Sequence, residues 1–153
     1  MEIKTKKLSL GAIRLLTLCA AILIAGTDTS LASDKSGSKF GGVQIGAITY
    51  SYRSMPDQSA DAVLNYIVQS GLSSVELMGD VAERYAGLPQ TKDQEVIRKW
   101  RTTVSMDKFK ELRKKFKSKG VQIHILKLGD KGWSDAEIHY AFNACTAVGA
   151  IGI

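Results

Sequence analysis

From residue 43 onward, short apolar runs alternate with longer segments whose apolar residues recur every three or four positions. The runs VQIGAITY (43–50), SSVELM (73–78) and VQIHILKLG (121–129) are typical of buried strands. Helix patterns that follow them end at a glycine, which favours helix C-termini because it adopts positive φ freely. After the last such glycine, the apolar stretch AIGI (150–153) predicts the beginning of a fourth strand.

Capping residues set the expected helix boundaries. Asp57 or Ser59 can cap the first helix, Ser105 a later one, and Ser134 with Glu137 forms a capping box, in which each side chain satisfies the other residue's backbone amide. The expected helices span residues 59–70, 105–119 and 134–148, with two shorter ones near 81–86 and 93–101.

This alternation of strands and helices predicts an α/β fold, a parallel sheet with helices packed outside it. The connections from strands to helices (50–58, 79–104 and 127–133) are much longer than the returns, and ligands of parallel folds bind at the carboxyl ends of strands. Two architectures fit the pattern: a truncated (β/α)8 barrel and a small complete doubly wound sheet. We favour the partial TIM barrel, about three and a half of eight units, because a full barrel takes about 250 residues.

The amino terminus has the layout of a secretory signal peptide. Lys4, Lys6 and Lys7 precede the apolar run LLTLCAAILIAG (15–26), and small residues before position 33 suit a signal peptidase. An uncleaved membrane anchor is the alternative, but the run is shorter than the ~20 residues that span a bilayer. We therefore expect a signal peptide at 1–32, a polar linker at 33–39, and a periplasmic or secreted protein without a stable membrane span after cleavage.

Cysteines and charge add little to this interpretation. Of the two cysteines, Cys19 leaves with the signal peptide, so Cys145 is expected to be a buried packing residue without a disulfide partner. The formal net charge of +6 sets no partner by itself. The basic run over residues 108–119 surrounds an apolar stripe, which indicates the solvated outer face of a helix rather than a nucleic-acid site.

Side chains alternate along a strand, so each strand divides its residues between two faces. The positions expected to face the helices are Val43, Ile45, Val75, Leu77, Val121, Ile123 and Ile125, and those expected to point inward are Gln44, Gly46, Ile48, Glu76, Met78, Gln122, His124 and Leu126.

Among the inward positions, Glu76 and His124 are the predicted catalytic residues. A carboxylate beside an imidazole can hold a substrate hydroxyl, orient a metal ligand, or act as acid and base. Alternatively, Glu76 is a structural carboxylate that accepts hydrogen bonds from polar barrel groups, and His124 is a hydrogen-bonded core histidine. Two residues alone do not make a metal site.

At GAITYSYR (46–53), SVELMGD (74–80), WRTTVSMDKFK (100–110) and GVQIHILK (120–127), the chain resembles the xylose-isomerase-like TIM barrel family. The likeness covers residues 40–153 and is greatest to exported members known as sugar phosphate isomerases or epimerases. It implies an eight-stranded barrel in which a divalent metal (Mn, Mg or Zn) assists proton transfer next to a sugar carbonyl. The family's metal ligands lie on later strands, so we expect no metal bound by this fragment alone, and no activity from it.

The same resemblance implies roles for residues near the strand ends. Tyr50 could stack on a sugar ring and Arg53 could bind its phosphate or carboxylate. Lys127, at the end of the third strand, could meet an anionic group, although it is more often simply exposed. Tyr50 packing in the core and Arg53 lying in solvent are the alternatives. Trp100 and Trp133 could form a wall of the site or simply pack.

The functional expectation is therefore an exported sugar (phosphate) isomerase or epimerase that acts on a small-molecule carbohydrate and binds no nucleic acid. A lyase or hydrolase acting on oxidised glycosides is an alternative, because the same proton abstraction can drive elimination. A non-catalytic module that binds carbohydrate or a partner chain is another. A half-barrel would leave its first and last strands as open edges, which favour pairing between chains.

Overall fold

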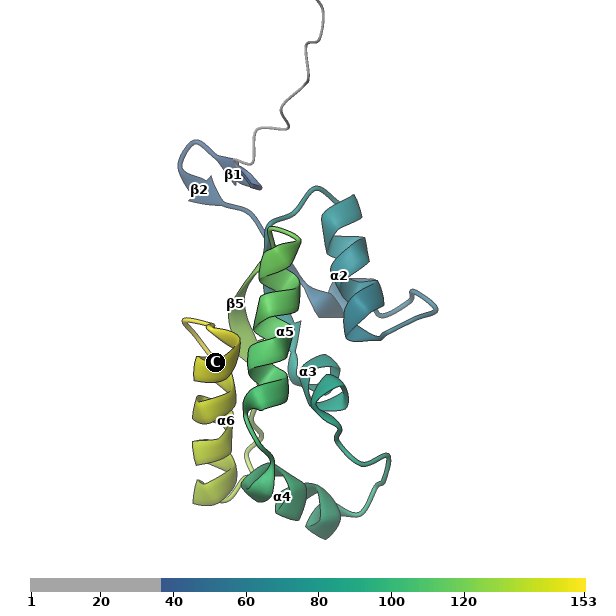
Figure 1. Ribbon diagram of the computed structural model, residues 1–153, viewed down its shortest axis with the longest axis vertical. Coiled ribbons are helices and arrows are strands. Elements are labelled where there is room, and N and C mark those ends of the chain that lie inside the picture. The colour runs from purple at the N-terminus through teal and green to yellow at the C-terminus, as the bar shows by residue number, and fades with distance from the viewer. Residues whose placement is uncertain (1–36) are drawn as a thin grey trace, which may run out of the picture. The chain divides into compact units, whose positions relative to one another are not determined.

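The computed structural model of the protein describes residues 37–153 (Figure 1). The predicted signal peptide, residues 1–32, lies outside the described residues. The end of the predicted linker, residues 37–39, belongs to a β-hairpin formed by β1 (Lys39–Phe40) and β2 (Val43–Gln44). The other elements are β3 (Ala47–Ile48), the 3-10 helix η1 (Thr49–Tyr52), α2 (Ala60–Gln69), β4 (Ser74–Met78), α3 (Gly79–Ala86), α4 (Gln94–Thr103), α5 (Asp107–Ser118), β5 (Gln122–Lys127) and α6 (Asp135–Val148).

The fold is α/β, as the alternation predicts. Strands β3, β4 and β5 form a parallel sheet in that order. On the other side of β5, Ile125 makes a parallel bridge to Gly152, where the fourth strand was expected to begin. Residues 37–153 form no closed barrel.

The first predicted strand, 43–50, is divided in the structure into the hairpin strand β2, the sheet strand β3 and the start of η1. Gly41 and Gly42, with φ of 54° and 85°, turn the chain back so that β2 pairs antiparallel with β1. The predictions that Val43 and Ile45 face the helices are therefore wrong: these residues are 62 % and 41 % exposed. Gln44 does not point into a barrel either, because its amide donates to the Ser38 carbonyl within the hairpin.

A β-bulge changes the alternation between β4 and β5. Val75 pairs with Ile123, but Glu76 pairs with Ile125, so His124 is the extra residue on β5. The next pair is Leu77 with Leu126. Both leucines are fully buried, so the prediction that Leu126 points inward is wrong. Ile125 is only half-buried and lies across from Glu76 instead of facing the helices.

The helices pack against the side of the sheet that carries Leu77 and Leu126. In Figure 1 the sheet strand β5 passes behind α5, and α6 lies beside α5. Residues from α2, β4, α5, β5 and α6 meet in one buried core, which includes Val63, Ile67, Val75, Leu77, Phe109, Leu112, Phe116, Ile123, Leu126, Tyr140 and Val148. The burial predicted for Val75, Leu77, Val121 and Ile123 is confirmed.

Local signals in the sequence set most helix ends. The predicted caps at Ser59 and Ser134 are present, and the Ser134–Glu137 capping box is complete. Cys145 is buried, as predicted, and burial raises the pKa of its thiol. The helices of the described range are all too short or too polar to cross a bilayer.

Truncation of two adjacent residues on β5 tests the bulge. We expect Leu126→Ala to lower the free energy of unfolding by about 2–5 kcal/mol, because it leaves a cavity in the core. The matched change Ile125→Ala should cost only about 1 kcal/mol, because that side chain keeps contact with solvent. Urea denaturation of both variants measures the difference, and a larger loss for Ile125→Ala would contradict the register.

Candidate functional site at the carboxyl ends of the strands

One face of the parallel sheet lies opposite the helices, and we refer to it as the open face. Its side chains follow from the register, because residues paired across strands share a face. They are Ile48, Ser74, Glu76, Met78, Gln122, His124, Ile125 and Lys127.

Glu76 and His124 lie on this face from neighbouring strands. The bulge leaves His124 next to the Glu76–Ile125 pair, and both predicted catalytic side chains are half-buried. Within residues 37–153, neither side chain forms a hydrogen bond or an ion pair. The described residues thus supply no hydrogen-bond partner that would make Glu76 a structural carboxylate or His124 a hydrogen-bonded core histidine. Both side chains can therefore hydrogen-bond to a ligand.

A cavity of about 270 Å³ opens where β4 and β5 end. Lys127 and Met78 extend it onto the open face, and α3 begins at its edge with Gly79. An added Cβ at Gly79 would lie 2.7 Å from the Lys127 carbonyl oxygen, so only glycine fits there. The volume is just below the ~300 Å³ at which small-molecule sites begin, enough for part of a ligand. Its lining residues are Met78, Gly79, Asp80, Glu83, Arg101, Lys127, Leu128, Gly129, Asp130 and Trp133.

Some of the charged groups at this cavity already form ion pairs or hydrogen bonds within the protein, and others do not. Asp80 pairs with Arg84 at 3.0 Å, and Asp130 accepts a hydrogen bond from the Lys131 backbone amide. Lys127 is exposed and forms no ion pair with another described residue. Lys127 is therefore the cation best able to meet an anionic or hydroxyl group of a ligand.

Tyr50 and Arg53 lie after β3, on and next to η1, and contact each other. The Arg53 guanidinium carbon is 4.6 Å from the centre of the Tyr50 ring, and its Nη1 donates to the Tyr50 carbonyl at 3.3 Å. Both are exposed, and neither lines the cavity that contains Lys127. The structure thus groups Glu76, His124 and Lys127 on one face, whereas Tyr50 and Arg53 form a separate pair.

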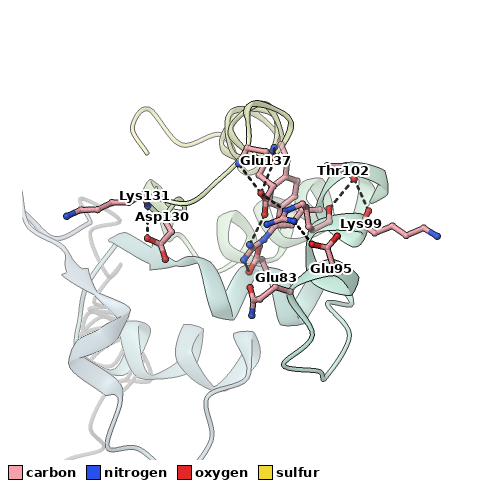
Figure 2. Close-up of polar contacts among 12 residues, drawn as sticks. Glu83, Glu95, Lys99, Thr102, Asp130, Lys131 and Glu137 are labelled. Atoms are coloured by element: carbon pink, nitrogen blue, oxygen red, sulfur yellow. Dashed lines mark hydrogen bonds and ion pairs between the residues drawn. The ribbon is translucent and has the colours of Figure 1, made fainter.

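A buried ion cluster joins three helices at one wall of the cavity, and no motif in the sequence indicates it. Arg101 on α4 binds both carboxylate oxygens of Glu83 on α3, with Nε 2.8 Å and Nη2 3.2 Å away. Its Nη1 lies 3.3 Å from Glu137 on α6. Figure 2 shows the dashed contacts that converge on Glu83 and Glu137, whereas Asp130 and Lys131 lie apart from them.

Neighbouring groups complete this cluster. The Tyr140 hydroxyl donates to Glu83 at 3.1 Å, and the Ser134 backbone and hydroxyl both reach Glu137. The Arg101 guanidinium lies 4.1 Å from the centre of the Trp133 ring, a cation–π contact. Every buried side-chain nitrogen or oxygen in the described residues has a hydrogen-bond partner.

The cluster is an anchor rather than an acid–base pair. Burial opposes the charge of Glu137, yet hydrogen bonds from Ser134 and Arg101 hold the pKa of this carboxyl below its ordinary value. Burial likewise opposes the charge of Arg101, yet Glu83 and Glu137 raise its pKa. Burial, together with the Glu83 carboxylate, raises the pKa of Tyr140. Since efficient proton transfer needs pKa values near the working pH, these residues do not exchange protons at neutral pH.

Only Glu137 had a signal in the sequence, and that signal was its place in a capping box. Glu83 and Arg101 lie on separate helices, and neither residue type nor spacing indicates that they meet. Among the described residues, no three side chains of His, Cys, Asp or Glu are grouped so that they could hold a metal ion.

Loss of Arg101 should destabilise the fold strongly. We expect Arg101→Met to lower the free energy of unfolding by about 3–5 kcal/mol, because Glu83 and Glu137 are then left buried with fewer partners. The control, Arg98→Met, removes an arginine whose side chain is 44 % exposed and 3.4 Å from Glu137, and should cost less than about 1 kcal/mol. Urea denaturation compares them, and equal losses would argue against the anchor.

Acid should weaken this anchor through Glu137. A carboxyl whose folded pKa is depressed adds stability above its unfolded pKa, near 4.3, and that stability is lost as the pH falls through the folded value. We expect the free energy of unfolding to fall less between pH 5 and pH 3 in Glu137→Gln than in the unchanged chain. The exposed Glu95→Gln control should follow the unchanged chain, and identical slopes for all three proteins would refute this.

Comparison of the chain with protein-family models, with curated proteins and with solved structures found no match.

Proposed function

We propose that the chain is the amino-terminal half of an exported sugar isomerase or epimerase of the xylose-isomerase-like kind. The observation that carries the proposal is the open face of the sheet. Parallel sheets are normally covered on both faces, and the helices of residues 37–153 pack on only one. In a barrel, the open face with Glu76 and His124 would be the interior wall.

The position of the cavity supports the same proposal. It lies at the carboxyl ends of β4 and β5, the end at which barrel enzymes bind their substrates. The long connection that contains α4 is tied to α3 and α6 at this end by Arg101. A rigid wall beside a small cavity suits a ligand that must be held in one orientation.

The residues on the open face suggest a division of roles. The Glu76 carboxylate can take a proton from carbon next to a carbonyl or hold a substrate hydroxyl, and the His124 imidazole can hydrogen-bond to a substrate oxygen or serve as the partner acid or base. Lys127, at the rim, can hold a phosphate, a carboxylate or a hydroxyl group of the sugar. Tyr50 and Arg53 would contact a larger substrate only if their stacked pair opened.

The divalent metal of the family does not fit the described residues alone. Glu76 and His124 would supply two ligands, whereas structural or catalytic metal sites need at least three from the protein. In the proposal, these two residues therefore act on the substrate directly.

Exchange of sugar protons in D2O tests the proposal. The chain and the product of its coding region extended past codon 153 would each be incubated with Mn²⁺ and a panel of aldoses, ketoses and their phosphates. Proton NMR would then follow deuterium incorporation next to the carbonyl. We expect exchange only from the extended product, lost with EDTA and slowed about a hundredfold by Glu76→Gln. The exposed Glu95→Gln serves as the control and should leave the rate unchanged.

Three results would contradict the proposal. The first is that the coding region past codon 153 encodes no further β/α units with acidic and histidine residues. The second is that the extended product exchanges no proton of any sugar in the panel. The third is that the chain alone turns over a sugar with a stoichiometric bound cation.

A further inference from the structure

A second cavity, of about 370 Å³, lies at the opposite end of the sheet from the candidate site. It opens near the C-terminal ends of α5 and α6, which lie side by side (Figure 1). Buried residues of the core, Val121, Ile123 and Val148, give it an apolar floor. Its polar lining consists of Arg113, Lys117 and Gln122, together with the turn glycines Gly120 and Gly149.

Among the described residues, the two cations of this cavity have no carboxylate partner, in contrast to three lysines of α5. Lys108, Lys110 and Lys115 pair with Glu111, Asp107 and Asp61 at 2.7, 3.1 and 2.5 Å. Within the described residues, Arg113 and Lys117 form no ion pair. They are four positions apart, so they are neighbours on the helix surface and repel each other.

Close packing also restricts where Arg113 can lie. A Cβ added at Gly149 would be 2.5 Å from Arg113 Nε and 2.6 Å from Cζ. Gly149 has φ of 72° and ends α6, so the absence of a side chain there serves both the turn and the approach of the guanidinium. The Arg113 side chain thus lies against the α6 turn at the edge of the cavity.

We propose that this cavity binds a small organic oxyanion, a carboxylate or phosphate ester with a short aliphatic group. The Arg113 guanidinium and the Lys117 ammonium bind the oxyanion. The aliphatic group covers the floor formed by Val121, Ile123 and Val148. The bound anion also relieves the repulsion between the two cations. The cavity lies at the amino ends of the strands, so this inference does not depend on the proposed function.

NMR titration of the full, ¹⁵N-labelled chain tests the proposal with three probes: butyl phosphate, butyrate and inorganic phosphate. We expect saturable shifts of the amides of Val121, Ile123 and Gly149, with butyl phosphate binding more tightly than inorganic phosphate because of the apolar floor. The comparison of butyl phosphate with butyrate identifies the preferred head group.

Charge-matched variants separate a built site from general attraction to the basic helix. Arg113→Gln and Lys117→Gln should each weaken binding about tenfold, the loss expected for one charge-assisted hydrogen bond. Lys114→Gln removes the same charge from the same helix outside the cavity lining and should leave the affinity unchanged. Circular dichroism confirms that each variant is folded.

The proposal is overturned if no probe gives saturable shifts, or if the shifts spread along α5 without involving the floor residues. Equal weakening by Lys114→Gln and Lys117→Gln would overturn it as well, because it would show that only net charge attracts the anion.

Discussion

The pairing of β4 with β5 is the constraint on which the rest of the structure depends. Its bulge inserts His124 between two regular stretches of the ladder, so that Ile123 and Leu126 both face the helices. The same insertion leaves His124 and Ile125 together on the side of Glu76. Because His124 is an extra residue in β5, Leu126 faces the core, and His124 and Ile125 lie on the open face with Glu76.

A second constraint acts across the helices. Arg101 is 14 % exposed at its side chain and is shared by Glu83 and Glu137, which come from the helices after β4 and β5. A buried cation needs such partners because its desolvation is costly. The arrangement fixes α4, the middle of the longest connection, at the carboxyl ends of the strands. Trp133 and Arg101 then form one wall of the cavity there.

Much of the fold could be predicted from local signals. Apolar runs, capping serines and terminal glycines placed the helices within a few residues, because these signals act over one or two turns. The faces of β5 could not be predicted beyond Ile123, since a bulge is decided by the partner strand and not by the sequence of β5. The pattern of VQIGAI (43–48) predicts one continuous strand and not the end of a hairpin, although Gly41 and Gly42 before it are a turn signal.

The candidate site could be predicted only in part for the same reason. Glu76 and His124 share a face because each follows a buried residue on its own strand, and that alternation is visible in the sequence. The meeting of Glu83, Arg101 and Glu137 depends on how three helices pack, and no spacing along the chain encodes it. The two groups also differ in their partners. Glu83, Arg101 and Glu137 are engaged with one another, whereas Glu76 and His124 have no hydrogen-bond partner among the described residues and can meet a ligand.

Thiol labelling along β5 tests the central claim most directly, in a chain with Cys19 and Cys145 replaced by alanine. Single cysteines at positions 123 to 126 would be treated with a maleimide under native conditions, and the labelling rates compared. The bulge predicts fast labelling at 124 and 125 and protection at 123 and 126. Strict alternation, with 124 and 126 reactive and 123 and 125 protected, would contradict the register and with it the placement of the candidate site.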